Sequence, residues 1–362
     1  MTAPLRSVVL AAALTALPAV AAAKDFLLAG AKPDKLVLID TARRKVERVI
    51  TIPGGGGPGP MAIAVSPDGK VAYVVVNRWE SIAGVDLDSG KQTFRADLSV
   101  GPERVKAMFG MDVSPDGKEL AVYLVPARLG ADEYTALDPR IAVYRTGDGV
   151  GARPARSLPA PRRIMQLAYA RDGARLFALG WELYVLDPAT GAVRETLPVR
   201  HRKRDGLGEP DVLNVWPTWE QSGVLAAPYA VARLDAQGKP VSAMAGLLSL
   251  DLDSGALAMN EFEENGPAIF AGVVNPVRRD EAYVVYTTLA KLDRRANKVV
   301  KRIELDHTYY NVNVASDGSE VYVGQTMSDI GVYSADTLKR LARIAIPGGA
   351  DQALATMRMI RR

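Results

Sequence analysis

Short runs that alternate apolar and polar residues recur along the chain, and the clearest set lies within residues 307–347. Asn311–Ala315 and Glu320–Gln325 alternate in this way around a Ser-Asp-Gly-Ser turn, and Ile330–Ser334 and Leu341–Ile346 do so around Ala-Asp-Thr-Leu. A period of two predicts half-buried β-strands, and Asp-Gly supplies the positive φ of a tight hairpin. Four strands in about forty residues do not bury their own faces, so this stretch is expected to be one member of a repeat.

Two sequence elements repeat along the rest of the chain. Hairpins around a tight acidic turn occur near Gly69, Gly117, Gly173, Asp280 and Asp317. An apolar strand, often ending in Asp, occurs seven times, mostly about 41 to 47 residues apart with longer gaps near 60: Leu36–Asp40, Ile82–Asp86, Ile141–Tyr144, Leu183–Asp187, Leu247–Asp251, Leu289–Asp293 and Ile330–Tyr333. Seven four-stranded repeats predict an all-β fold, a seven-bladed β-propeller with antiparallel blades.

The two ends of the chain carry complementary parts of one blade. Phe26–Ile50 has the outer strands of a blade without an Asp-Gly hairpin before them, and Ala353–Ile360 has one spare strand. Pairing of the N- and C-terminal segments in a composite blade would close the propeller. The alternative is an irregular C-terminal tail.

The first 23 residues differ from the rest in composition. Arg6 is their only charged side chain, and Ser7–Ala23 is an alanine-rich apolar run that ends in three alanines. A basic start, an apolar middle and small residues at the end predict a secretory signal cleaved before Lys24, which leaves residues 24–362 as a single exported propeller domain. An N-terminal membrane anchor is the alternative. The mature chain has no other stretch apolar enough to insert in a membrane.

The chain contains no cysteine and only two histidines, His201 and His307. The missing thiols exclude disulfides, covalently attached c-type haem and cysteine-ligated zinc or iron–sulfur sites on this chain. Two histidines, one of them in a basic loop, are too few for a histidine-rich metal site and do not assemble a Ser-His-Asp triad, so no catalytic, cofactor or metal residue is predicted. The basic run Arg200–Arg204 is typical of a solvated loop, and no nucleic-acid partner is expected.

Propeller topology predicts which face carries function. The hairpin turns within strand pairs are short and uniform and share one face, whereas the irregular connections share the other: Pro53–Pro60, Ser99–Lys106, Val125–Pro139, Arg200–Asp211, Pro228–Gly246 and Asp306–Tyr310. Long irregular loops on a rigid scaffold usually carry function. The face with the irregular loops is therefore the expected working face.

Three groups on this face are candidates for a substrate cavity or a partner interface: His307, Tyr309 and Tyr310; Trp216 and Trp219; and Glu103 and Arg104. In the first group Asp306 would fix the imidazole tautomer. Each group also has a purely structural interpretation. These are a His–Asp hydrogen bond with aromatic side chains between blades, tryptophans that fill the space between blades, and a solvated ion pair.

Five segments carry a resemblance to a known family: Pro102–Lys106, Asp112–Lys118, Pro210–Pro217, Leu305–Tyr310 and Ile346–Gly349. In this order they resemble the β-chain of quinohaemoprotein amine dehydrogenase, a seven-bladed propeller of the YVTN type. The Ser-Pro-Asp-Gly turn occurs in many propellers, whereas Asp-His-Thr-Tyr-Tyr and Asp-Val-Leu-x-Val-Trp-Pro are much more specific. The resemblance covers nearly all of the mature chain.

The resemblance implies a non-catalytic subunit of a periplasmic heterotrimer that oxidatively deaminates primary amines. A small subunit would carry a quinone built from Trp and Cys, a second subunit would carry two c-type haems, and this chain would support the small subunit and help wall the substrate cavity. No cofactor is expected on this chain, in keeping with its lack of cysteine. The alternatives are a stand-alone propeller that binds a partner in the cell envelope and a lactonase-like hydrolase.

Overall fold

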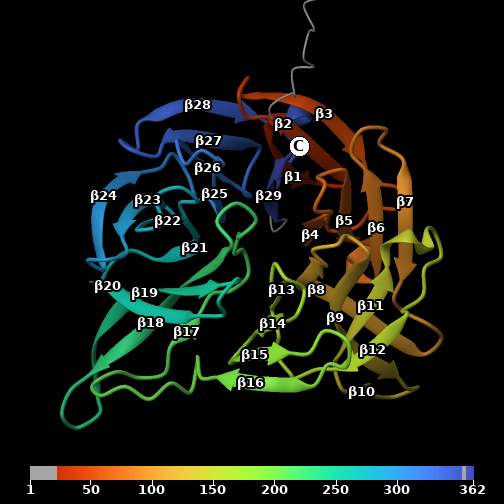
Figure 1. The fold of residues 1–362 in the computed structure, drawn as a ribbon, viewed down its shortest axis with the longest axis horizontal. Coiled ribbons are helices and arrows are strands. Elements are labelled where there is room, and N and C mark those ends of the chain that lie inside the picture. The colour runs from red at the N-terminus through yellow and green to blue at the C-terminus, as the bar shows by residue number, and fades with distance from the viewer. Residues whose placement is uncertain (1–22, 353–355) are drawn as a thin grey trace, which may run out of the picture.

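The computed structural model describes residues 23–352 and 356–362. Within them the chain forms seven antiparallel sheets arranged as blades around one axis (Figure 1), which confirms the predicted seven-bladed propeller. The predicted signal segment, residues 1–23, lies outside the described residues except for Ala23. No helix in the described part of the chain is long and apolar enough to cross a membrane.

The blades follow one another along the chain. The first complete blades are β4 (Ile63–Val65), β5 (Val71–Val76), β6 (Ser81–Asp86) and β7 (Gln92–Asp97); β8 (Glu103–Val113), β9 (Glu119–Leu129), β11 (Arg140–Arg145) and β12 (Arg156–Pro159), to which β10 (Tyr134–Ala136) adds a fifth strand; and β13 (Gln166–Tyr169), β14 (Leu176–Leu179), β15 (Leu183–Leu186) and β16 (Val193–Leu197).

Three further blades complete most of the circle. They are β17 (Asp211–Val212), β18 (Val224–Leu234), β19 (Pro240–Asp251) and β20 (Leu257–Glu264); β21 (Ile269–Val274), β22 (Glu281–Tyr286), β23 (Thr288–Asp293) and β24 (Lys298–Glu304); and β25 (Asn311–Val314), β26 (Glu320–Gly324), β27 (Asp329–Ser334) and β28 (Arg340–Ala345). Short 3-10 turns occur at Asn77–Trp79, Thr146–Asp148 and Pro347–Gly349.

The seventh blade joins the two ends of the chain. β29 (Met357–Arg361) supplies the inner strand next to β1 (Asp25–Ala31), followed by β2 (Lys35–Asp40) and β3 (Lys45–Thr51). The β1–β29 register runs from Asp25 opposite Arg361 to Ala29 opposite Met357. The predicted closure is therefore confirmed, and it ties the ends of a repeat that would otherwise leave two open sheet edges.

Aromatic side chains fill the space between blades. Phe94 is fully buried, and its ring meets Tyr73 at 5.5 Å and Tyr144 at 6.0 Å, both edge to face. Gly84 makes room for this cluster, because a Cβ there would lie 2.6 Å from the Cβ of Phe94. Edge-to-face rings add packing energy beyond the burial of apolar area, so these rings fix the angle between neighbouring blades.

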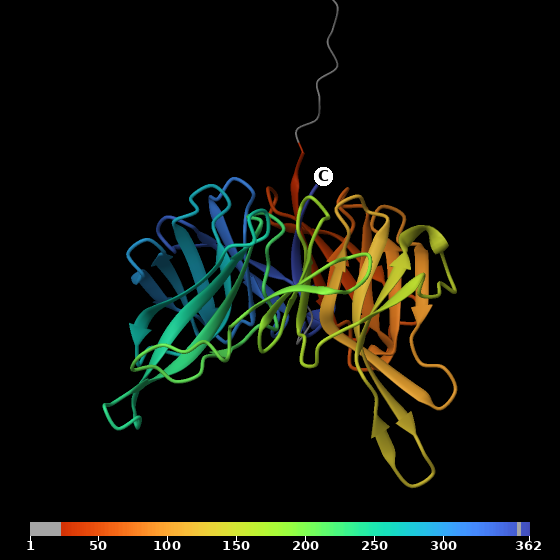
Figure 2. The same cartoon turned by 60° about the horizontal axis from the view of Figure 1, so that its bottom comes forward.

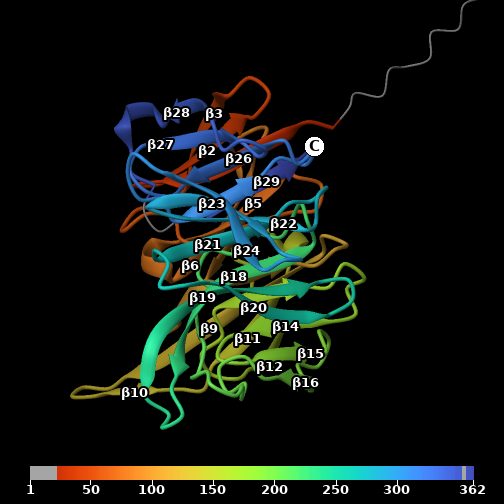
Figure 3. The ribbon, with the colours of Figure 1, turned by 90° about the vertical axis from the view of Figure 1, so that its left-hand side faces the viewer.

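Two hairpins are longer than the blade requires. One is built from β9 and β10, and the other from the distal halves of β18 and β19. Both project from the same face, opposite the side where the described chain begins (Figures 2 and 3). We call them the β9–β10 arm and the β18–β19 arm. They lie on the face that also carries the irregular connections between blades.

Candidate functional site

An irregular segment, residues 213–221, spans the propeller axis. The inner strand of this blade, β17, is only two residues long and pairs with β18 only at Asp211 and Val212, so the chain that follows it is irregular. Side chains from three other blades hold the segment through its backbone carbonyls: Gln166 Nε2 to Asn214 O (2.9 Å) and Val215 O (3.0 Å), Asn311 Nδ2 to Trp216 O (3.0 Å), and Arg358 Nη1 to Pro217 O (3.1 Å). We call residues 213–221 the axial segment.

Arg358 lies at the centre of this arrangement. Its side chain is almost completely buried, pairs with Glu220 at 2.7 Å, and donates from Nε to the carbonyl of Ile63 at 2.8 Å. Its guanidinium also lies 4.8 Å from the ring centroid of Trp219. Trp219, a predicted interface residue, is thus buried against a cation at the axis.

His307 is held by Asp329 rather than by Asp306, so the expected partner was wrong. His307 Nε2 lies 2.8 Å from Asp329 Oδ1, and its Nδ1 lies 2.8 Å from the carbonyl oxygen of Thr308. Asp306 instead pairs with Arg340. Both ring nitrogens of His307 therefore face acceptor oxygens.

The Asp329 carboxylate accepts hydrogen bonds from three side chains. Besides His307, Tyr309 Oη and Arg343 Nε each donate to its Oδ2 at 2.8 Å. Burial alone would raise the pKa of Asp329, but these hydrogen bonds hold it below its ordinary value. Tyr309 is buried in this network, which is the geometry of the structural alternative considered for this group.

Thr326, His307 and Asp329 superficially resemble a nucleophilic triad. Thr326 Oγ1 lies 3.5 Å from His307 Nδ1, but it donates its proton to the carbonyl of Thr308, which also accepts from Nδ1. A general base needs a free lone pair facing the nucleophile. This nitrogen has none while it donates to Thr308, so the group is built to hold structure rather than to attack a substrate.

A stack of half-exposed aromatic rings lies beside this network on the face with the arms. Phe270 and Tyr286 stack at 3.8 Å, and Tyr310 lies 5.0 Å from Phe270 and 5.1 Å from Trp216. Trp216 itself is buried, and its indole nitrogen has no hydrogen-bond partner among the described residues. We call Trp216, Phe270, Tyr286 and Tyr310 the aromatic stack.

The sequence analysis identified two of the four residues of the aromatic stack. Tyr310 and Trp216 were candidates because they stand in irregular segments. Phe270 and Tyr286 were missed because they belong to ordinary strands, Phe270 near the start of β21 and Tyr286 at the end of β22, where an aromatic residue is expected to be core. Only the packing of neighbouring blades brings the four rings to one place.

Glu103 and Arg104, the remaining candidates, do not pair with each other. Glu103 accepts from Arg140 at 2.6 Å, and Arg104 lies 3.4 Å from Glu80. Both stand at the start of β8, near the base of the β9–β10 arm. Whether they or the other candidate residues contact a substrate or partner stays a prediction.

Asp112 is a titratable group at the axis that the sequence did not single out. Its carboxylate accepts from the backbone N–H of Tyr169 at 2.8 Å and that of Val113 at 2.9 Å. Burial raises the pKa of Asp112 to about 7, assisted by the negative charge of Glu220 and opposed by the Tyr169 hydrogen bond. No group of three or more metal-ligating side chains forms in residues 23–352 and 356–362.

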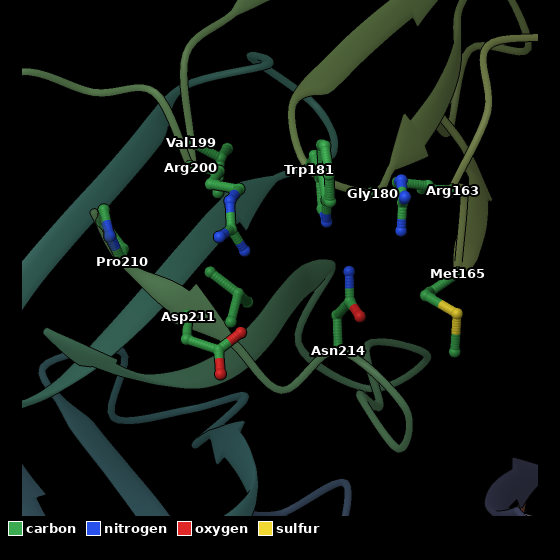
Figure 4. Close-up of a pocket in the computed structure, with 10 residues that line it drawn as sticks. Arg163, Met165, Gly180, Trp181, Val199, Arg200, Pro210, Asp211 and Asn214 are labelled. Atoms are coloured by element: carbon green, nitrogen blue, oxygen red, sulfur yellow. The ribbon is translucent and has the colours of Figure 1, made fainter.

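A cavity of about 300 Å³ opens on the face with the arms, beside Trp181 (Figure 4). It lies between the blade of β13–β16 and the strand β17, and its lining includes Arg163, Met165, Trp181, Arg200 and Asn214. None of these was a candidate, although Arg200 begins the basic run and Asn214 lies in the Pro210–Pro217 segment of the resemblance. We call it the Trp181 cavity.

No family model and no curated protein sequence matches the chain. Solved structures with a similar fold include hydrazine synthase of Kuenenia stuttgartiensis (TM-score 0.56, 16% identity, 86% of this chain and 90% of that chain). Others are dihydro-heme d1 dehydrogenase NirN in complex with DHE (0.53, 14%, 95% and 77%) and apo AztD from Citrobacter koseri (0.52, 13%, 94% and 98%). At these identities the similarity shows the propeller fold alone.

Proposed function

We propose that this chain is the non-catalytic propeller subunit of a periplasmic amine dehydrogenase of the quinohaemoprotein type. Its role would be to seat a small quinone-bearing subunit on the face with the arms and to help wall the cavity where primary amines are oxidised. A dihaem cytochrome c subunit would carry the electrons onward. Two of the similar folds bear the names of a synthase and a dehydrogenase, so a role in redox enzymes is compatible with the fold.

One observation carries the proposal. The two most specific segments of the resemblance, Pro210–Pro217 and Leu305–Tyr310, pack against each other although they lie far apart in the sequence. The rings of Trp216 and Tyr310 are 5.1 Å apart, and Asn311, directly after the second segment, donates to the Trp216 carbonyl. The two segments that carry the resemblance thus form one packed unit on the irregular face.

The chemistry of the chain agrees with a supporting role. Without cysteine it supplies neither the thioether of a Trp-derived quinone nor a c-type haem attachment. The polar atoms of the His307–Asp329 pair already bond to neighbouring donors and acceptors, and so do those of the buried Arg358 with Glu220. The half-exposed rings of the aromatic stack, by contrast, are of the kind that anchors protein interfaces.

The proposal is tested by purifying the chain with its native partners from the periplasm. Co-purification with a haem-staining chain and a small quinone-staining chain, together with dye-linked oxidation of primary amines, is the expected result. A colourless monomer that hydrolyses a lactone would overturn the proposal in favour of a hydrolase. A colourless, inactive monomer would overturn it in favour of a stand-alone binding propeller.

A further inference from the structure

The Trp181 cavity is built around an indole held between two guanidinium groups. The Cζ atom of Arg163 lies 3.9 Å from the Trp181 ring centroid and that of Arg200 lies 4.8 Å from it, on the two sides of the ring (Figure 4). Cations at these distances from an indole face are attracted to its electrons. The ring is 40% exposed, so the arrangement presents its free edge to the cavity.

The backbone around Trp181 is fixed by buried contacts. Trp181 lies in the tight turn between β14 and β15, where Gly180 N–H donates to Glu182 O at 2.9 Å and Arg200 N–H donates to Trp181 O at 2.8 Å. The buried Glu182 carboxylate accepts from Val199 N–H at 2.6 Å. A Cβ on Gly180 would lie 2.3 Å from the Arg163 carbonyl, so only glycine fits there.

Arg163 occupies a strained conformation with a φ of +67°. Residues other than glycine rarely adopt this region, and where they do the strain often belongs to a ligand clamp. The conformation places its guanidinium against Trp181. In the described part of the chain the Arg163 guanidinium has no hydrogen bond or acidic partner, whereas its neighbour Arg162 pairs with Asp138 at 2.8 Å.

Asn214 adds a second unpaired donor. The residue is 95% buried, given its relative exposure of 5%, yet its side-chain amide forms no hydrogen bond within the described residues and faces the cavity (Figure 4). An amide that lines a cavity without a protein partner is open to an acceptor from a bound molecule or from water. Arg163 and Asn214 therefore offer donors without acceptors at one end of the cavity.

The remaining walls set the shape and charge of a ligand. Met165, Val199 and Val212 give an apolar lining. Asp211 stands on the wall opposite Arg163, and the lining cation Arg200 is paired with Glu209 at 3.2 Å, so Arg163 is the lining cation left without an acidic partner in the described part of the chain. An acceptor group is favoured at the Arg163 end only, and a second anionic group is repelled at the other end.

We propose that the Trp181 cavity binds a small organic monocarboxylate. Its carboxylate accepts hydrogen bonds from Arg163 and Asn214, and its apolar body lies against Met165, Val199 and Val212. Charge-assisted hydrogen bonds to a guanidinium are among the strongest a carboxylate forms, and the apolar lining contributes the rest of the affinity. The site belongs to this chain alone and does not depend on the amine dehydrogenase assignment.

Isothermal titration calorimetry on the isolated mature chain tests the proposal with hexanoate, hexylamine and adipate. Hexanoate is expected to bind at least about tenfold more tightly than the other two, because the amine lacks the acceptor and the diacid meets Asp211. Arg163→Gln should weaken hexanoate binding at least about tenfold, while the matched control Arg162→Gln changes it less than about twofold. Arg163→Gly, which accepts the positive φ, gives the same test if Arg163→Gln is unstable.

Three results would overturn the site. The first is no heat of hexanoate binding up to about 20 mM, a concentration at which a built pocket of this size should be filled. The second is an affinity for hexylamine equal to that for hexanoate. The third is an affinity for hexanoate that is the same in the folded Arg163 variants as in the wild type. The result is independent of partner chains. A chain that binds hexanoate but co-purifies with no haem or quinone would keep the site and reject the proposed function, and the converse outcome would do the opposite.

Discussion

Arg358 and Glu220 form an ion pair across the propeller axis, with Nη1 and Oε1 2.7 Å apart. Arg358 belongs to β29 near the end of the chain, and Glu220 belongs to the axial segment. The pair therefore joins the closing strand of the propeller to the segment that replaces a normal inner strand. Closure of the circle and positioning of the axial segment depend on the same side chain.

Arg358→Met is expected to lower the free energy of unfolding by about 2–4 kcal/mol, because it leaves the buried carbonyls of Ile63 and Pro217 without their donor and removes the partner of the partly exposed Glu220 carboxylate. Urea unfolding followed by circular dichroism measures the change. The matched control is Arg233→Met, which removes an exposed pair with Glu264 on the β18–β19 arm and should cost less than about 1 kcal/mol. Equal losses in the two variants would show that the axial pair has no structural role.

A second prediction concerns Asp112 and the dependence of stability on pH. Because its pKa rises to about 7 in the folded protein, the folded state holds this proton more tightly than the unfolded state does. Its contribution to stability is complete below the unfolded pKa of about 4 and is lost as pH rises through 7. Asp112→Asn should therefore flatten the fall in stability between pH 5 and 8.

Unfolding midpoints of the wild type and Asp112→Asn across this pH range measure the effect. The difference between the two curves should favour the wild type more at pH 5 than at pH 8. A difference that does not change with pH would mean that the Asp112 carboxyl titrates normally in the folded protein.

Asp329 should make stability depend on pH in the opposite direction to Asp112, so that stability falls as the pH becomes acid. Hydrogen bonds from Arg343, Tyr309 and His307 keep its pKa low in spite of burial, so its contribution is present above the unfolded pKa and is lost as pH falls through the lower folded value. Asp329→Asn should destabilise the protein at pH 6 and show a smaller further loss between pH 5 and 3. Parallel thermal-unfolding curves for the two proteins over that range would contradict this prediction.

The repeat could be predicted because its determinants are local. In the turn near Gly117, Ser114 Oγ donates to Asp116 Oδ1 at 2.6 Å, and both residues lie in the same short motif. Five hairpins around an acidic turn and seven apolar strands of this local kind define the blades. Closure followed from the two incomplete ends, whose strands pair as expected.

The candidate site was less predictable because its contacts join distant residues. The axial segment lacks strand periodicity, and the residues that hold it, Gln166, Asn311 and Arg358, lie in three other blades. The sequence suggested Asp306 as the partner of His307 because it is adjacent, but the fold points the ring at Asp329. The Trp181 cavity combines connections from two blades, and no spacing in the sequence relates them.

The last prediction tests the aromatic stack as a contact for a partner chain. Phe270→Glu places a charge at the half-exposed centre of the stack, where an interface would have to bury it unpaired. We expect the haem- and quinone-bearing chains that co-purify with the propeller to fall at least about tenfold, since burying one unpaired charge costs more than 1.4 kcal/mol. Haem absorbance and quinone staining of the purified complex measure this loss.

The matched control for Phe270→Glu is Val300→Glu, on the exposed outer strand β24. It adds the same charge away from the stack and should leave the partners bound. Thermal unfolding of both variants shows whether the propeller itself is intact. If Phe270→Glu folds and retains its partners as fully as Val300→Glu does, the partner does not bind at the aromatic stack. The interface must then lie elsewhere on the propeller.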